Sequence, residues 1–151
     1  MRKLRTVVTL IAVIAGFILS SSPMVRAEVG VTDTEILIGN SSPQSGPTAF
    51  MSLNSNMGIL SVFKSVNERG GVHGRKLKYI SYDDGYQPPK TVANVKRLID
   101  RDHVFILFHI GGTPTTLAAY KYSHPSGVPI FIPNTWANVL INPLKQDLFM
   151  M

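Results

Sequence analysis

The feature that most constrains the fold of this chain is the alternation of short β-rich apolar runs with longer helical patterns. The apolar runs span residues 35–39, 76–82, 104–110 and 128–132. Helical periodicity occupies the segments between them, near residues 48–68, 90–102 and 113–123. Because the links are short, the order β-α-β-α-β-α-β predicts an α/β fold in which a parallel sheet carries helices on both faces.

The third apolar run and the turn behind it form the most informative stretch. Residues 104–110 are unbroken and β-rich, which predicts a strand buried on both faces. Gly111 and Gly112 allow the backbone to turn and to approach another group closely. Thr113 is predicted to be the N-cap of the next helix, with Pro114 at the first helical position. The free N–H groups of this helix start suit a small anion such as a carboxylate or phosphate, although an ordinary capped turn has the same pattern.

The predicted helices carry apolar faces that should pack on the sheet. In the first helix the expected apolar stripe contains Leu53, Met57, Leu60 and Phe63, widened by Ile59 and Val66. In the second helix it contains Val92, Val95, Leu98 and Ile99, and in the third Leu117, Ala118 and Tyr120. The glycines of residues 70–74 follow a helix rather than a strand, so they are interpreted as turn residues and not as a dinucleotide-binding motif.

The loops that follow the predicted strands hold the candidate binding residues. Ligands of open parallel sheets bind beyond the carboxyl ends of the strands. In chain order, the loops there supply Ser45 and Thr48, then Asp83, Asp84 and Tyr86, then Thr113 and Thr115, then Asn134, Thr135 and Trp136. Neutral donors and acceptors with two aromatic rings suit a small polar or zwitterionic molecule with an apolar part.

The same loops are poorly suited to catalysis. His109 is the one histidine near this end, and inside a buried strand it is interpreted as a core residue rather than a base. Asp83 and Asp84 could form a metal or phosphotransfer pair, but carboxylates at a strand end more often cap a turn or position a loop. The sequence has no His-x-x-x-His spacing and no Gly-x-Ser-x-Gly motif. We therefore expect no enzyme activity, no metal site and no cofactor.

Residues 1–27 have the three parts of a secretory signal peptide. Arg2, Lys3 and Arg5 precede an apolar run over residues 7–19, and Ala27 ends a cleavage-site pattern. A membrane anchor is the alternative, although the run is short for a bilayer. The chain has no cysteine, which excludes lipid attachment and disulfides. Cleavage after Ala27 and release into the periplasm are therefore expected.

The positive charge of the chain is concentrated in this leader. The formal net charge is +6, but four of the 15 basic residues and none of the nine acidic ones lie in residues 1–27. The remaining excess is small, so nucleic acid is not an expected partner. Residues 28–151 are enough for one domain with a real core but not for two.

Several motifs, in order along the chain, resemble one known family. They are residues 30–39, Ser45-Gly-Pro47, Asn67-Glu-Arg-Gly-Gly-Val-His-Gly-Arg-Lys76, Asp83-Asp-Gly-Tyr-Gln-Pro-Pro-Lys90 and Gly112-Thr-Pro-Thr115. Together they resemble the N-terminal lobe of periplasmic solute-binding proteins of the branched-chain amino-acid type, which serve ABC importers. The run Asn-Glu-x-Gly-Gly-x-x-Gly-Arg is the most specific of them, and the likeness extends from Glu28 to about Asn138.

The resemblance implies a fold, a function and a site. The fold would be the N-terminal lobe of a type I periplasmic-binding-protein fold, over residues 28–151, incomplete and without the second lobe. The function would be an extracytoplasmic receptor that captures an amino acid and presents it to a membrane ABC permease. Thr113 and Thr135 would hold the α-carboxylate and α-amine, with Ser45, Tyr86 and Thr115 nearby and backbone carbonyls near Asn134 contributing.

Two features depart from the family pattern and keep other hypotheses open. The exit of the fourth strand usually has small residues, whereas this chain has Asn134 and Trp136. Family members close two lobes over their ligand, so one lobe alone is expected to bind amino acids only weakly and to expose an apolar sheet face. One alternative is a truncated, non-functional fragment of such a receptor. Another is a small α/β phosphoacceptor or enzyme domain, although the first strand ends in Asn40-Ser-Ser rather than in an acidic cluster.

Overall fold

The computed structural model describes residues 28–135, 137–141 and 148–149. The predicted signal peptide and Trp136 therefore lie outside the described residues. Among the helices of the described part, none combines the length and the apolar character that crossing a membrane requires.

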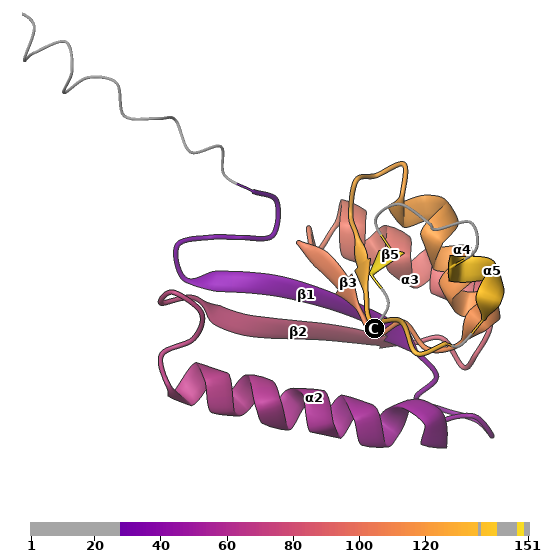
Figure 1. The fold of residues 1–151 in the computed structure, drawn as a ribbon, viewed down its shortest axis with the longest axis horizontal. Helices are drawn as coiled ribbons and strands as arrows, with labels where there is room; N and C mark the ends of the chain where they lie inside the picture. The colour runs from indigo at the N-terminus through magenta and orange to yellow at the C-terminus, as the bar shows by residue number, and fades with distance from the viewer. Residues whose placement is uncertain (1–27, 136, 142–147, 150–151) are drawn as a thin grey trace, which may run out of the picture.

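The described residues form an α/β fold around a five-stranded parallel sheet with the order β2-β1-β3-β4-β5. The strands are β1 (Glu35–Ser42), β2 (Lys76–Asp83), β3 (Ile106–Phe108), β4 (Ile130–Phe131) and β5 (Leu148–Phe149). The helices are α2 (Phe50–Glu68), α3 (Pro88–Asp100), α4 (Thr113–Ser123) and α5 (Asn138–Ile141). Figure 1 shows α2 on one side of β1 and β2, with α3 and α4 on the other side of the sheet. The predicted fold class is confirmed.

The third strand is shorter and less buried than predicted. Only residues 106–108 pair as a strand, Ile106 and Phe108 are half-buried, and Phe105 is exposed. His103 and His109 flank the strand with φ values of 52° and 58°. These left-handed conformations break the extended backbone on both sides of the pairing segment, which an apolar run in the sequence does not reveal.

The core lies between the sheet and the helices α3 and α4. Val95 and Leu98 of α3 are fully buried, as predicted, and they pack with Leu107 of β3 and Ile130 of β4. A β-carbon on Gly39 would stand 3.1 Å from a Leu98 methyl group, so the glycine lets α3 lie close on the sheet. In α4 the fully buried positions are Thr115, Thr116 and Ala119, whereas the predicted Leu117, Ala118 and Tyr120 are only half-buried.

The predicted apolar face of α2 is wrong for Leu53, Met57 and Leu60, whereas Ile59, Phe63 and Val66 are half-buried. Leu53, Met57 and Leu60 are 44%, 62% and 51% exposed, and the buried residues of the helix are Ser52 and Asn56. The cause is the polar surface on which the first half of α2 lies. The Asn56 amide donates to Ser42 Oγ at 3.2 Å and accepts from the Tyr79 hydroxyl at 3.0 Å. Hydrogen bonds thus hold Asn56 inward, whereas the buried Ser52 hydroxyl has no partner among the described residues, and the apolar side chains of this half of the helix face outward.

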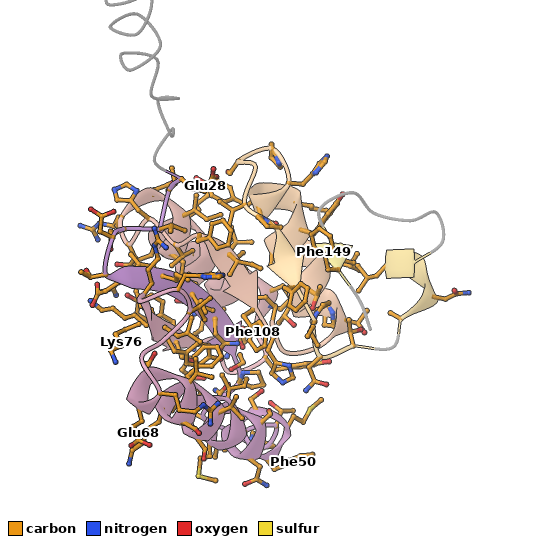
Figure 2. All side chains as sticks on the ribbon, turned by 60° about the vertical axis from the view of Figure 1, so that its left-hand side comes forward. Glu28, Phe50, Glu68, Lys76, Phe108 and Phe149 are labelled. Atoms are coloured by element: carbon orange, nitrogen blue, oxygen red, sulfur yellow. The ribbon has the colours of Figure 1, made fainter. Side chains whose placement is uncertain are left out.

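Aromatic rings continue across the α2 side of the sheet. Phe63 of α2 contacts Tyr79 and Phe108, Phe108 stacks on Phe131, and Phe131 contacts Phe149. Phe108 and Phe149 can be located in Figure 2, in which all described side chains are drawn. Phe149 is 51% exposed, so this row of rings reaches solvent at strand β5.

Candidate functional site

The four loops at the carboxyl ends of the strands meet at Gly111 and Gly112. A β-carbon on Gly111 would stand 2.8 Å from Pro43 in the first loop, and one on Gly112 would stand 2.2 Å from the ring of Tyr86 in the second. The fourth loop joins by a parallel bridge between Gly111 and Asn134. The predicted close approach of the backbone at the two glycines is confirmed, and it brings all four loops together.

The N-cap of α4 is Gly112 and not Thr113, so the predicted cap is wrong by one residue. Gly112 has φ 97° and ψ 159°, a conformation that glycine adopts without strain. Thr113 is already helical, Pro114 is in the first turn, and no side chain caps the helix. The helix start therefore keeps the free N–H groups that the sequence predicts, without a threonine hydroxyl blocking them.

Three threonine hydroxyls near this helix start have different partners. Thr113 Oγ1 and Thr135 Oγ1 lie 2.6 Å apart and share one hydrogen bond. Thr115 Oγ1 is buried and donates to the carbonyls of Gly111 and Gly112, so its hydroxyl is committed to its own turn. Within residues 28–135, the backbone N–H groups of Thr113 and Thr115 have no acceptor. The spot thus offers the Thr113 amide donor beside a pair of hydroxyls, with the unpaired Thr115 amide buried behind it.

Of Ser45 and Asn134, only Asn134 contacts the glycine turn at the start of α4. Asn134 accepts from the Gly112 N–H at 3.0 Å and donates its own N–H to Ile110 at 2.8 Å. Its side-chain amide donates to the Met51 carbonyl at 3.4 Å, which links the fourth loop to α2. The Ser45 hydroxyl is exposed and donates to Asp83. Ser45 is thus held on the second loop, whereas Asn134 is directly bonded to the glycine turn.

Asp83 holds the first loop against the second. Its carboxylate accepts from the N–H groups of Gln44, Ser45 and Gly85 and from the Ser45 hydroxyl. Partial burial raises the pKa of Asp83, but the hydrogen bonds from Ser45, Gln44 and Gly85 outweigh it and hold the pKa below its usual range. The prediction that the acidic pair positions a loop is confirmed for Asp83.

Asp84 is fully buried at the start of the second loop, directly after β2. Its Oδ2 atom accepts from the hydroxyls of Ser41 and Thr91 at 2.8 and 2.9 Å, and its Oδ1 atom accepts from the Tyr86 N–H at 2.9 Å. Both carboxylates thus act as hydrogen-bond acceptors that hold the loops in place. The described residues also contain no group of three acidic, histidine or cysteine side chains that could hold a metal ion.

His109 is half-buried on the sheet, in the environment of a core residue rather than of a base. Burial lowers the pKa of its imidazole, and a hydrogen bond with the Ile132 backbone raises it by less, so the ring favours the neutral form. Its Nε2 atom is buried without a hydrogen-bond partner among the described residues. No nucleophilic side chain is placed beside it in the described hydrogen-bond network.

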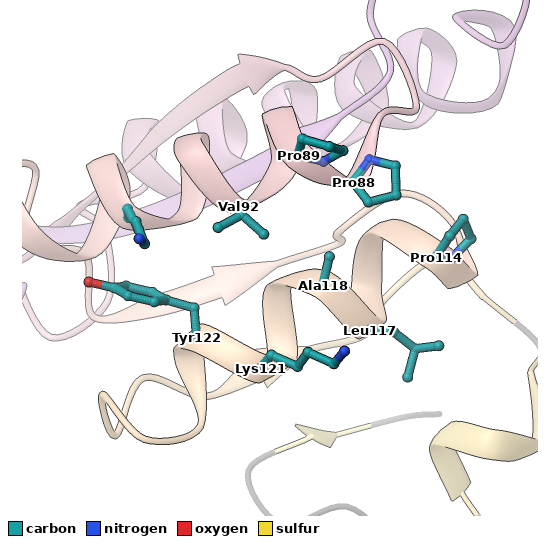
Figure 3. Close-up of a pocket in the computed structure, with 9 residues that line it drawn as sticks. Pro88, Pro89, Val92, Pro114, Leu117, Ala118, Lys121 and Tyr122 are labelled. Atoms are coloured by element: carbon teal, nitrogen blue, oxygen red, sulfur yellow. The ribbon is translucent and has the colours of Figure 1, made fainter.

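A groove of about 550 Å³ lies between α3 and α4, outside the set of predicted site residues. Figure 3 shows Pro88 and Pro89 of α3 facing Pro114 of α4 at one end and Lys121 and Tyr122 at the other. It is lined by outward-facing residues of two helices that are far apart in the sequence. Periodicity within either helix therefore gives no indication of it.

Comparison with known proteins gives one consistent result. A family model described as periplasmic binding protein matches residues 35–146. The leucine-, isoleucine-, valine-, threonine- and alanine-binding protein of Pseudomonas aeruginosa is 28% identical over 102 residues, which cover 68% of this chain and 27% of that protein. The matched curated relatives are thus much longer than this chain, which spans between a quarter and a third of their length.

Solved structures of similar proteins have the same fold as the described residues. A possible leucine/isoleucine/valine-binding protein from Rhodopirellula baltica superposes with a TM-score of 0.69 and 30% identity, over 78% of this chain and 31% of that one. The branched-chain amino acid transporter substrate binding protein of Streptococcus pneumoniae, solved with isoleucine, shares the fold with a TM-score of 0.72 at 20% identity, over 78% of this chain and 33% of that one.

Proposed function

Because this chain belongs to the periplasmic binding protein family, we propose that residues 28–151 form the N-terminal lobe of an extracytoplasmic receptor for an amino acid. The observation that carries the proposal is the start of α4. There the unpaired N–H group of the half-buried Thr113 lies beside the hydroxyl pair of Thr113 and Thr135, and the unpaired N–H group of Thr115 is buried in the same turn.

This arrangement fits the carboxylate of an amino acid. Amide N–H groups at a helix N-terminus carry partial positive charge and donate to anions without a cationic side chain. The hydroxyls of Thr113 and Thr135 can each donate or accept, so one can serve the carboxylate while the other accepts from the α-amine. The Asn134 carbonyl, next to Gly112, has a further lone pair for the amine.

A branched-chain or similar side chain is the proposed apolar part of the ligand. The relatives named for leucine, isoleucine and valine binding support this class. The lobe would bind the solute and present it to a membrane ABC permease, acting as a receptor and not as an enzyme. Residues 1–27 would act as a signal peptide cleaved after Ala27, which would deliver the protein to the periplasm.

An NMR titration of the purified protein with leucine tests this function. We expect saturable shifts of the Thr113 and Thr115 amide resonances, because residues 28–151 supply the part of the site that holds the carboxylate. Leucinol keeps the amine and the side chain but lacks the carboxylate, and we expect it to leave these amides unshifted. Equal shifts with leucinol, or shifts confined to other parts of the chain, would contradict the proposal.

A further inference from the structure

Tyr86 has an unusual backbone conformation next to the proposed site. Its φ is 64°, in the left-handed region that a bulky residue adopts only when its surroundings hold it there. Its ring lies against the α-carbon of Gly112, where a β-carbon would stand 2.2 Å from Cε2, 2.9 Å from Cζ and 3.0 Å from the hydroxyl oxygen. The ring of Tyr86 therefore occupies the place that a side chain on Gly112 would take.

Asp84 supplies the contact that holds this conformation. Its Oδ1 atom accepts from the Tyr86 N–H at 2.9 Å, and its backbone carbonyl accepts from the Gln87 N–H at 2.9 Å. Its Oδ2 atom is tied to β1 through Ser41 and to α3 through Thr91. These hydrogen bonds anchor the carboxylate to two rigid elements. Because Asp84 is also fully buried, a ligand cannot reach it.

Gly112 in turn determines where the first turn of α4 points. Its N–H donates to Asn134 at 3.0 Å, and its carbonyl accepts from the Thr116 N–H at 2.9 Å and from the hydroxyls of Thr115 and Thr116. The Tyr86 ring packs on the side of this residue that these hydrogen bonds leave open. If the ring were displaced, Gly112, which joins the glycine turn to α4, could change its backbone orientation.

We propose that Asp84 is a positioning residue of the ligand site. It holds Tyr86 across Gly112, and the ring fixes the first turn of α4 in the orientation that presents the Thr113 N–H group. The inference rests on the proposed function, since it assigns a role within that site. In this role Tyr86 acts on the site through Gly112, and not only by lying near the ligand.

The test compares Asp84→Ala with Asp84→Asn in the purified protein. Asparagine keeps an oxygen that can accept from the Tyr86 N–H, whereas alanine removes it. Asp100→Asn is the matched control, because Asp100 is an exposed acceptor for Tyr122 at the C-terminal end of α3, far along the helix from the loop that holds Asp84. Tyr86→Leu removes the ring and leaves Asp84 in place, which covers the case in which Asp84→Ala fails to fold.

Two readouts are measured by NMR for each variant. The first is the ring-current shift of the Gly112 α-protons, which reports the position of the Tyr86 ring without any ligand. The second is the leucine dependence of the Thr113 and Thr115 amide resonances. We expect Asp84→Ala and Tyr86→Leu to lose the ring-current shift and to bind leucine several-fold more weakly. Asp84→Asn and Asp100→Asn should retain both properties.

The outcomes separate this inference from the proposed function. A wild-type protein that keeps the ring-current shift but shows no leucine response would overturn the proposed function. If the wild type responds to leucine and folded Asp84→Ala or Tyr86→Leu responds equally well, the positioning role is overturned. An unchanged Gly112 shift in Asp84→Ala overturns it as well, with or without leucine.

Discussion

The hydroxyl oxygens of Thr113 and Thr135 lie 2.6 Å apart, although 22 residues separate them in the chain. They meet because β3 and β4 are parallel neighbours whose exit loops are joined by the bridge between Gly111 and Asn134. One of the two hydroxyls must donate to the other, so their hydrogen-bonding capacity is shared. A ligand carboxylate and amine could divide this pair between them.

Thr113→Val tests the hydroxyl pair. The change keeps the branched shape and removes the donor, so we expect the leucine-induced shift of the Thr135 resonances to disappear. The cost in unfolding free energy should be about 1 kcal/mol, the usual net value of one hydrogen bond. NMR titration and urea unfolding measure the two effects. Ser126→Ala, at the other end of α4, is the control and should leave the leucine response unchanged.

Gly112→Ala tests the close approach of Tyr86. The new methyl group would meet the Tyr86 ring and the residue would keep a φ of 97°, so we expect a loss on the order of 3 kcal/mol in unfolding free energy. Gly127→Ala is the matched control, with φ 72° and nothing within 4 Å of the added carbon, and it should cost only about 1–2 kcal/mol.

A double-mutant cycle isolates the contact itself. Tyr86→Ala should recover part of the stability lost in Gly112→Ala, because the ring that blocks the methyl group is gone. Urea unfolding of the two single variants and the double variant gives the coupling energy. Additive effects, or equal losses for Gly112→Ala and Gly127→Ala, would show that the ring does not press on the glycine.

Asp83→Asn tests the link between the first two loops through its pH dependence. The folded-state pKa of Asp83 is below its unfolded value, so its ionised form stabilises the fold. This contribution is present above the unfolded pKa of about 3.9 and is lost as the pH falls through the folded pKa. The stability difference between wild type and Asp83→Asn should therefore shrink in acid. Urea unfolding at neutral and acidic pH measures it, with Asp33→Asn as a control, and a pH-independent difference would refute the link.

Leu98→Ala and Leu60→Ala together test the helix packing. Leu98 is fully buried on the inner face of α3, so its truncation should cost about 2–5 kcal/mol. Leu60 is 51% exposed on the outer side of α2, so its truncation should change stability by no more than about 0.5 kcal/mol. Denaturation followed by circular dichroism compares them. Similar losses would mean that the outer side of α2 is covered by other parts of the protein.

The parts of the fold that follow from local chemistry could be predicted from the sequence. The apolar runs and the turn residues between them predict the strands and the parallel sheet, because short links force the crossover order. Gly111 and Gly112 predict the close backbone approach at the third loop. Ser45, Tyr86, Thr113, Asn134 and Thr135 follow strands, so topology alone places them at one end of the sheet.

The parts that depend on which surfaces meet could not be predicted in this way. Hydrophobic periodicity predicts that Leu53, Met57 and Leu60 face the sheet. The surface beneath this part of α2 is the polar end of β1, so Ser52 and Asn56 face it instead. The buried partners of Asp84 are Ser41 of β1 and Thr91 of α3, and no pattern in the sequence links either residue to Asp84. The polar run Asn40-Ser41-Ser42 at the end of an apolar strand is the local sign that buried polar contacts occur there.

A crystal structure of the protein soaked with leucine tests the central claim most directly. We expect the leucine carboxylate at the start of α4, within hydrogen-bond distance of the Thr113 N–H group, and the amine beside Thr135. Leucine bound in the groove between α3 and α4, or at any place from which its carboxylate does not reach this amide, would contradict the proposed function.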